Sequence, residues 1–145
     1  MKGFNFKLQK LLDIRLDKEE QCKIGFQVAE REKSKVEDSL KTLNGEYSKY
    51  NVLKKQETLI EQKIRNNYLN VLSFKIEDTE EVLKEKEVIL IEKRGELIES
   101  QIDRKTVEIL KEKKKKEFIK NEEKKEQNFI DELALYSYIR THERR

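Results

Sequence analysis

Apolar residues recur along the first third of the chain at alternating steps of four and three residues. A repeat of this kind averages 3.5 residues and places one narrow apolar stripe along a helix, where it packs against a partner helix. We call this stripe the first seam, and it predicts a helix from about residue 4 to about residue 53. Its positions are Cys22, Phe26, Ala29, Lys33, Val36, Leu40, Leu43, Tyr47 and Tyr50, and the register extends back to Glu19, Arg15, Leu12 and Leu8.

A second seam lies further along the chain and predicts a second helix over about residues 59–141. It has leucine or isoleucine at every seventh position, namely Leu69, Ile76, Leu83, Leu90 and Leu97. Beyond these positions we expect the stripe to drift to Ile91, Ile98, Ile102 and Ile109, and later to Ile119, Ile130, Leu133 and Ala134. A drift of this kind indicates either stutters in the repeat or a helix that changes the face it turns to its partner. Residues 111–127 are poor in seam residues, and we expect them to protrude without a partner.

The connection between the two helices is expected where the apolar stripe lapses after Leu53. Thr58 is followed by Glu61 three residues later, the spacing of a capping box, in which each side chain bonds the backbone N–H of the other residue. This favours a turn at residues 54–58. The alternative is a turn at residues 75–79, where the same spacing recurs.

The composition favours long helices joined by few turns. Among 145 residues there are four glycines and no proline, and tight turns depend on such residues. At Asn44-Gly45 the first seam continues in phase, so we expect Gly45 inside the helix at a cost of about 1 kcal/mol relative to alanine. Two long helices in one chain most simply fold back on each other. The predicted fold is all-α, an antiparallel two-helix coiled-coil hairpin forming a single domain over residues 1–145.

The charges are numerous but mixed in sign, with 33 basic and 30 acidic side chains and a net charge of +3. A nucleic-acid-binding protein usually carries a larger and more segregated basic excess, so no nucleic-acid partner is expected. The one dense basic run is Lys113–Lys116, which is flanked by glutamates. We interpret it as a solvated helix turn, with an acidic protein surface as the first alternative and lipid or nucleic acid after that.

Candidate catalytic chemistry is sparse. Cys22 is the only cysteine and lies on the first seam, which favours a small buried hydrophobe over a reactive thiol. His142 is the only histidine, and a lone histidine does not supply the paired groups of hydrolases. We therefore expect no catalytic, cofactor or metal site and no enzyme activity. No apolar run approaches the roughly 18 residues of a membrane span, which makes a cytoplasmic protein the expectation.

Aromatic residues gather near the expected turn: Tyr47, Tyr50, Tyr68 and Phe74. Aromatic side chains are frequent anchors at protein interfaces because they bury a large area at low entropy cost. The alternative for Tyr47 and Tyr50, which fall on the first seam, is that they pack inside the hairpin.

Four segments carry a resemblance to a known family. Residues 4–15 resemble the start of many FliJ proteins, the general chaperones of the flagellar type III export apparatus. Residues 65–69 look like the family segment that follows its tip, and residues 105–116 are similar to its second helix, which is rich in lysine and glutamate. Residues 129–134 match its acidic end. The resemblance covers nearly the whole chain.

The resemblance implies an antiparallel two-helix coiled coil in the cytoplasm, peripheral to the inner face of the cell membrane at the flagellar export apparatus. A hairpin of this kind is expected to be a monomer. Its implied partners are the export ATPase FliI, the cytoplasmic domain of the export gate protein FlhA, and substrate chaperones. By similarity to the central stalk of rotary ATPases, such a coiled coil would link the ATPase ring to the gate.

The resemblance also implies a gate-binding surface made by both helices near the tip. The matching positions are Leu43, Tyr50, Tyr68 and Leu72. Four other positions of that surface depart from the best-known family pattern: Ser39, Glu46, Lys75 and Thr79.

Two other classes of protein fit the same seams. The first is a structural coiled coil, such as a homodimeric scaffold or a stalk subunit of a virulence secretion system or rotary ATPase. The second is a small basic helical protein that binds nucleic acid, which would bind DNA with a steep dependence on salt.

Overall fold

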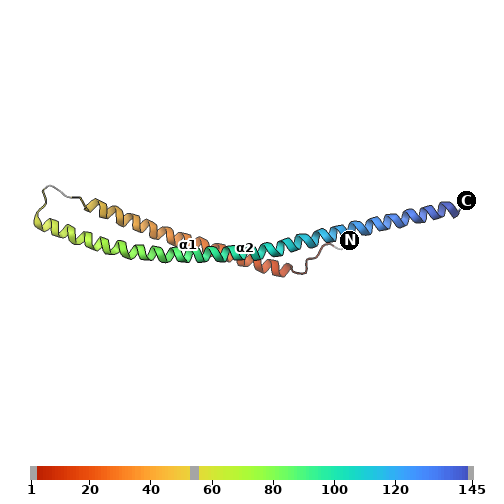
Figure 1. Cartoon of the computed structure of the whole chain (residues 1–145), viewed down its shortest axis with the longest axis horizontal. Coiled ribbons are helices and arrows are strands. Elements are labelled where there is room, and N and C mark those ends of the chain that lie inside the picture. The colour runs from red at the N-terminus through yellow and green to blue at the C-terminus, as the bar shows by residue number, and fades with distance from the viewer. Residues whose placement is uncertain (1–2, 53–55, 144–145) are drawn as a thin grey trace. The chain divides into compact units, whose positions relative to one another are not determined.

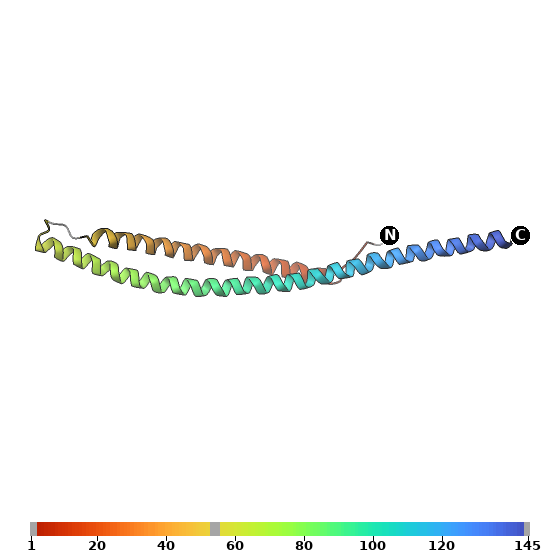
Figure 2. The same cartoon turned by 45° about the horizontal axis from the view of Figure 1, so that its top comes forward.

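The computed structural model describes residues 3–52 and 56–143. These residues form two helices, α1 (Gln9–Tyr50) and α2 (Leu59–Glu143). Figures 1 and 2 show α1 lying beside α2 with the opposite chain direction, so the predicted all-α helical hairpin is confirmed. Packing divides the chain into a unit of residues 18–100, here the tip unit, and a unit of residues 1–17 and 101–145, here the terminal unit. The single domain expected over residues 1–145 stays a prediction.

The tip unit is held together by the two predicted seams. On α1, the first-seam positions from Cys22 to Tyr47 are all buried or half-buried, and Ala29 is only 6% exposed. On α2, all five heptad positions from Leu69 to Leu97 are likewise buried or half-buried. Heptad spacing keeps one face of each helix turned to the other over this length, so the seam prediction is confirmed here.

The predicted drift of the second seam is wrong. Ile91 and Ile98 are 68% and 49% exposed, while the seam continues in strict heptad phase through half-buried Lys93 and buried Ser100. Lysine packs a long apolar stem and keeps its ammonium group near water, and the Lys93 stem passes close to Gly25. The Ser100 hydroxyl donates to the carbonyl of Leu97 at 2.7 Å. Both side chains therefore occupy seam positions, although they are polar and the apolar pattern of the sequence does not include them.

The terminal unit has a small core of Phe6, Leu12 and Val107, with Phe4 and Leu11 packed against it. α1 begins at Gln9 rather than at the expected residue 4. Phe4 and Phe6 are two positions apart and both pack in this cluster, which an extended backbone allows because side chains two apart then share a side. Burying these two rings therefore stabilises the fold more than one further helical turn would.

The last turns of α2 have no neighbouring segment in either view (Figures 1 and 2). Lys111 and Phe118 are still half-buried, and the Phe118 ring lies 5.7 Å from that of Phe4. Every residue from 123 to 143 is exposed. The expected protrusion of residues 111–127 therefore holds for its last part. All the residues predicted for a drifted seam in this unit are exposed. They are Ile102, Ile109, Ile119, Ile130, Leu133 and Ala134.

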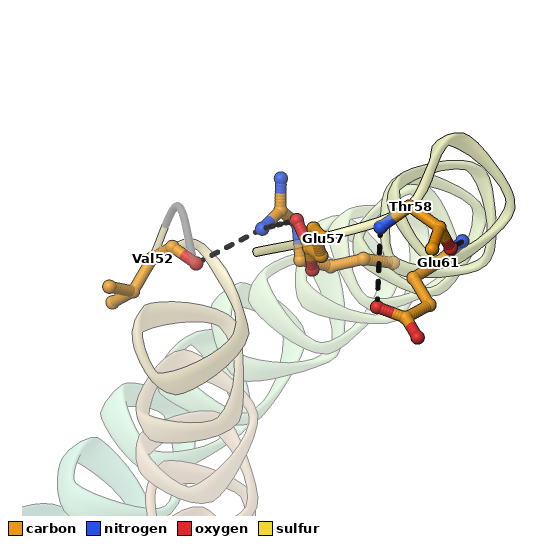
Figure 3. Close-up of polar contacts among 5 residues, drawn as sticks. Val52, Glu57, Thr58 and Glu61 are labelled. Carbon is orange, nitrogen blue, oxygen red and sulfur yellow. Dashed lines mark hydrogen bonds and ion pairs between the residues drawn. The ribbon is translucent and has the colours of Figure 1, made fainter. Parts of the chain in front are cut away.

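The helices are joined between Tyr50 and Leu59. Residues 54 and 55 of the expected turn lie outside the described residues. The capping box is confirmed, because the Glu61 N–H donates to Thr58 Oγ1 at 3.2 Å and the Thr58 N–H donates to Glu61 Oε2 at 3.4 Å (Figure 3). The alternative turn at residues 75–79 is wrong, since α2 runs through it and the Thr79 hydroxyl donates to the Lys75 carbonyl four residues back.

Candidate protein-binding surfaces

The end of the hairpin is fixed by one arginine. Arg65 Nη1 donates to the Val52 carbonyl at 3.0 Å and lies 2.7 Å from Glu57 Oε2. Figure 3 draws both contacts as dashed lines that end on Val52 and on Glu57. The side chains of Arg65 and Glu57 are only 14% and 9% exposed, and removing one partner of a largely buried ion pair leaves the other charge uncompensated. Arg65 therefore ties the start of α2 to the chain that follows α1.

Two tyrosines meet beside this tie. Tyr50 ends α1 and Tyr68 lies near the start of α2, with ring centroids 5.0 Å apart in an edge-to-face arrangement. Tyr68 Oη donates to Glu46 Oε2 at 3.1 Å. This hydrogen bond to a carboxylate, helped by partial desolvation, raises the pKa of Tyr68 above 10.0. Glu46 is one of the positions that depart from the best-known FliJ pattern, and here it orients Tyr68.

A groove of about 730 Å³ lies next to the tyrosine pair. Its lining residues are Lys49, Tyr50, Val52, Glu57, Glu61, Ile64, Arg65 and Tyr68. Tyr50 and Tyr68 are about two-fifths exposed, and Ile64 is 64% exposed. An apolar groove that also has charged groups in its lining suits the capture of an apolar side chain from another protein. We call it the tyrosine groove.

The structure separates the four residues predicted from the family resemblance. Tyr50 and Tyr68 line the tyrosine groove, whereas Leu43 is half-buried in the seam and Leu72 is 2% exposed. A side chain as buried as Leu72 cannot touch another protein while the helices are paired. The binding role of all four residues stays a prediction.

Sequence reasoning missed Ile64 and Arg65 as parts of this surface. The signal for Ile64 was its position out of heptad phase with Leu69, because an apolar residue off the seam is exposed in a hairpin. Arg65 had no comparable signal, since its two partners are brought to it only by the chain reversal.

A second uncovered apolar surface lies at the end of α2. Its side chains are between 42% and 67% exposed and comprise Phe129, Ile130, Leu133, Leu135, Tyr136, Tyr138 and Ile139. At about 100° per residue these positions point to all sides of the helix. A helix that is apolar all round is normally found buried. We call it the C-terminal apolar segment.

The remaining candidate groups lie on helix surfaces. Cys22 is half-buried on the first seam, and the His142 ring packs 4.1 Å from that of Tyr138. Lys114 forms a 3.6 Å ion pair with Glu117, and Lys113–Lys116 are exposed along α2. Within residues 3–52 and 56–143, the acidic residues, Cys22 and His142 form no cluster suited to a metal ion. Neither described helix has a stretch apolar enough to cross a bilayer.

The fold and its surfaces define a class: helical hairpins with a coiled-coil seam and exposed apolar patches. Within that class, the family model described as flagellar FliJ protein matches residues 4–143. The chain belongs to the FliJ family and is thereby a component of flagellar protein export. Searches of curated proteins and of solved structures gave no match.

Proposed function

We propose that this protein connects the flagellar export ATPase FliI to the export gate protein FlhA and also receives substrate chaperones, in the cytoplasm at the inner face of the membrane. The observation that carries the proposal is that both units have an uncovered apolar surface. These are the tyrosine groove in the tip unit and the C-terminal apolar segment in the terminal unit. A connector needs two separate docking surfaces, and these two lie in different units.

The tyrosine groove is the surface that we assign to the gate. Tyrosine is among the residue types that dominate binding energy at interfaces, and the family resemblance matches Tyr50 and Tyr68 to gate contacts. In this assignment the two tyrosines touch the gate directly. Leu43 and Leu72 support them from the seam, because their packing positions the helices that carry the tyrosines.

The C-terminal apolar segment is the surface that we assign to the ATPase. Side chains such as Phe129, Ile130 and Leu135 point in different directions around the helix, so a flat partner would cover only some of them. A socket that surrounds the helix, such as the centre of a ring of subunits, would cover them all. The paired helices would then transmit force or position between the two partners.

The test is a binding titration with purified FliI and, separately, the purified FlhA cytoplasmic domain. Tyr68→Ala should weaken gate binding by at least about fivefold, the effect of losing a residue worth more than about 1 kcal/mol, with ATPase binding unchanged. Leu133→Ala should weaken ATPase binding and leave gate binding unchanged.

Ile91→Ala is the matched control, because Ile91 is 68% exposed but lies outside both surfaces, and it should alter neither affinity. Failure of the unaltered protein to bind either partner would refute the proposal. If Tyr68→Ala weakened only ATPase binding, the two surfaces would be assigned the wrong way round.

A further inference from the structure

The first turns of α2 carry a second apolar stripe on the face opposite the seam. Its positions follow the same alternating steps of four and three: Ile60, Ile64, Asn67, Val71, Phe74 and Asp78. The four apolar side chains are between 49% and 74% exposed, whereas Leu69 and Leu72 on the seam are 9% and 2% exposed. We call this row the outer stripe.

The outer stripe has the form of a coiled-coil seam without a partner. Single exposed apolar residues are ordinary on a protein surface, but four in heptad phase on one helix face are what knobs-into-holes packing requires. α1 packs on the other face of α2. Another helix is therefore needed to cover the outer stripe.

The charges beside the outer stripe indicate which helix fits. Lys63 and Glu77 flank it on one side, and Glu61 and Lys75 flank it on the other. If a second copy of α2 lies antiparallel with its Leu69 level with Leu69 of the first, each flanking lysine faces a glutamate. Lys63 then meets Glu77 of the second copy, Glu61 meets Lys75 of the second copy, and symmetry repeats both pairs.

The same alignment forms one apolar pair in each half of the interface and leaves Ile60 opposite Asp78. Ile64 of one copy lies opposite Phe74 of the other, and Val71 lies opposite Asn67. A parallel alignment in register does not bring these oppositely charged residues together. Flanking charge pairs of this kind contribute modestly to affinity but select orientation and partner.

We propose that two copies of this chain pair antiparallel through the outer stripe and form a weak, reversible dimer. The interface is short, and Asn67 and Asp78 interrupt its apolar row, which places it among low-affinity associations. The monomer expected from the sequence is then the form present at low concentration.

The proposal is tested by sedimentation velocity of the full chain across the micromolar range. The unaltered chain should shift from monomer to dimer as concentration rises, and Phe74→Ser should remove the shift. Ile91→Ser is the matched control, an exposed isoleucine of α2 outside the outer stripe, and should dimerise like the unaltered chain. Circular dichroism checks that each variant keeps its helix content.

Charge reversal tests the antiparallel arrangement. Lys63→Glu or Glu77→Lys alone places like charges opposite each other twice in the dimer, which should weaken association about tenfold. The double variant with both changes restores attraction and should recover the original dimerisation. A monomer at every concentration, or a double variant as weak as the single ones, would overturn the proposal and leave the outer stripe to a helix of a different protein.

Discussion

Leu90 and Ile91 are neighbours on α2 with side chains of nearly equal size, and they decide which face of the helix is the seam. Leu90 is 8% exposed and Ile91 is 68% exposed. The apolar pattern of the sequence favours a drift of the seam to Ile91, whereas the structure keeps it at Leu90. Substituting each by alanine in turn therefore compares the two possibilities directly.

The expected magnitudes follow from burial. Truncating a buried leucine to alanine typically costs about 2–5 kcal/mol, from lost transfer free energy plus the cavity left behind. A two-helix seam is open to solvent along both edges, so the helices can partly close the gap. We expect Leu90→Ala to lower the free energy of unfolding by about 2–3 kcal/mol. Ile91→Ala should change it by no more than about 0.5 kcal/mol, with a small gain from the higher helix propensity of alanine.

The assay is urea-induced unfolding followed by circular dichroism, with the midpoint and slope fitted for each variant. Low protein concentration keeps self-association out of the measurement. Equal losses of stability in the two variants, or a larger loss in Ile91→Ala, would show that α2 turns a different face to α1 and would refute the heptad register described above.

Three further predictions concern the tip unit. Thr58→Ala removes the capping box with Glu61 and should lower the free energy of unfolding by about 1 kcal/mol, while Thr58→Ser should retain it; equal losses in chemical denaturation would contradict the cap. Gly45→Ala should raise stability by about 1 kcal/mol, because a Cβ at Gly45 meets nothing within 4 Å; a lower thermal midpoint would contradict this. The raised pKa of Tyr68 means that its hydrogen bond to Glu46 stabilises the fold fully below pH 10.0 and is lost as the pH rises through the folded-state pKa. Ultraviolet titration of the phenolate should show one late-ionising tyrosine that Tyr68→Phe removes, and its persistence in that variant would contradict the assignment.

Features that depend on nearby residues were predicted well. The capping box at Thr58 and Glu61 joins residues three apart, and the helical state of Gly45 follows from the phase of its neighbours. The packing of the N-terminal segment was missed. Phe4 and Phe6 leave the helical register because they pack on α2 near Val107 and Phe118, and no pattern within residues 4–15 announces a partner about a hundred residues away.

For the candidate binding surface, too, some residues were predicted from the sequence and others were not. The aromatic residues near the turn and the family resemblance identified Tyr50 and Tyr68 as candidates. The burial of Leu72, the tie made by Arg65 and the hydrogen bond from Tyr68 to Glu46 all depend on the chain reversal. Sequence spacing says nothing about which side chains a reversal brings within hydrogen-bond distance.

The sequence by itself determined that this protein is two long helices paired along a 3.5-residue repeat, since helix formation and seam periodicity are properties of neighbouring residues. Only the tertiary structure decided whether the seam on α2 drifts to Ile91 and Ile98 or continues in heptad phase. A seam is defined by its partner, so Lys93 and Ser100 lie inside it while Ile91 and Ile98 remain in water. The outer stripe stays uncovered because α1 packs on one face of α2 only. The C-terminal apolar segment stays uncovered because α1, with 42 residues against 85 in α2, is too short to pair with the last turns.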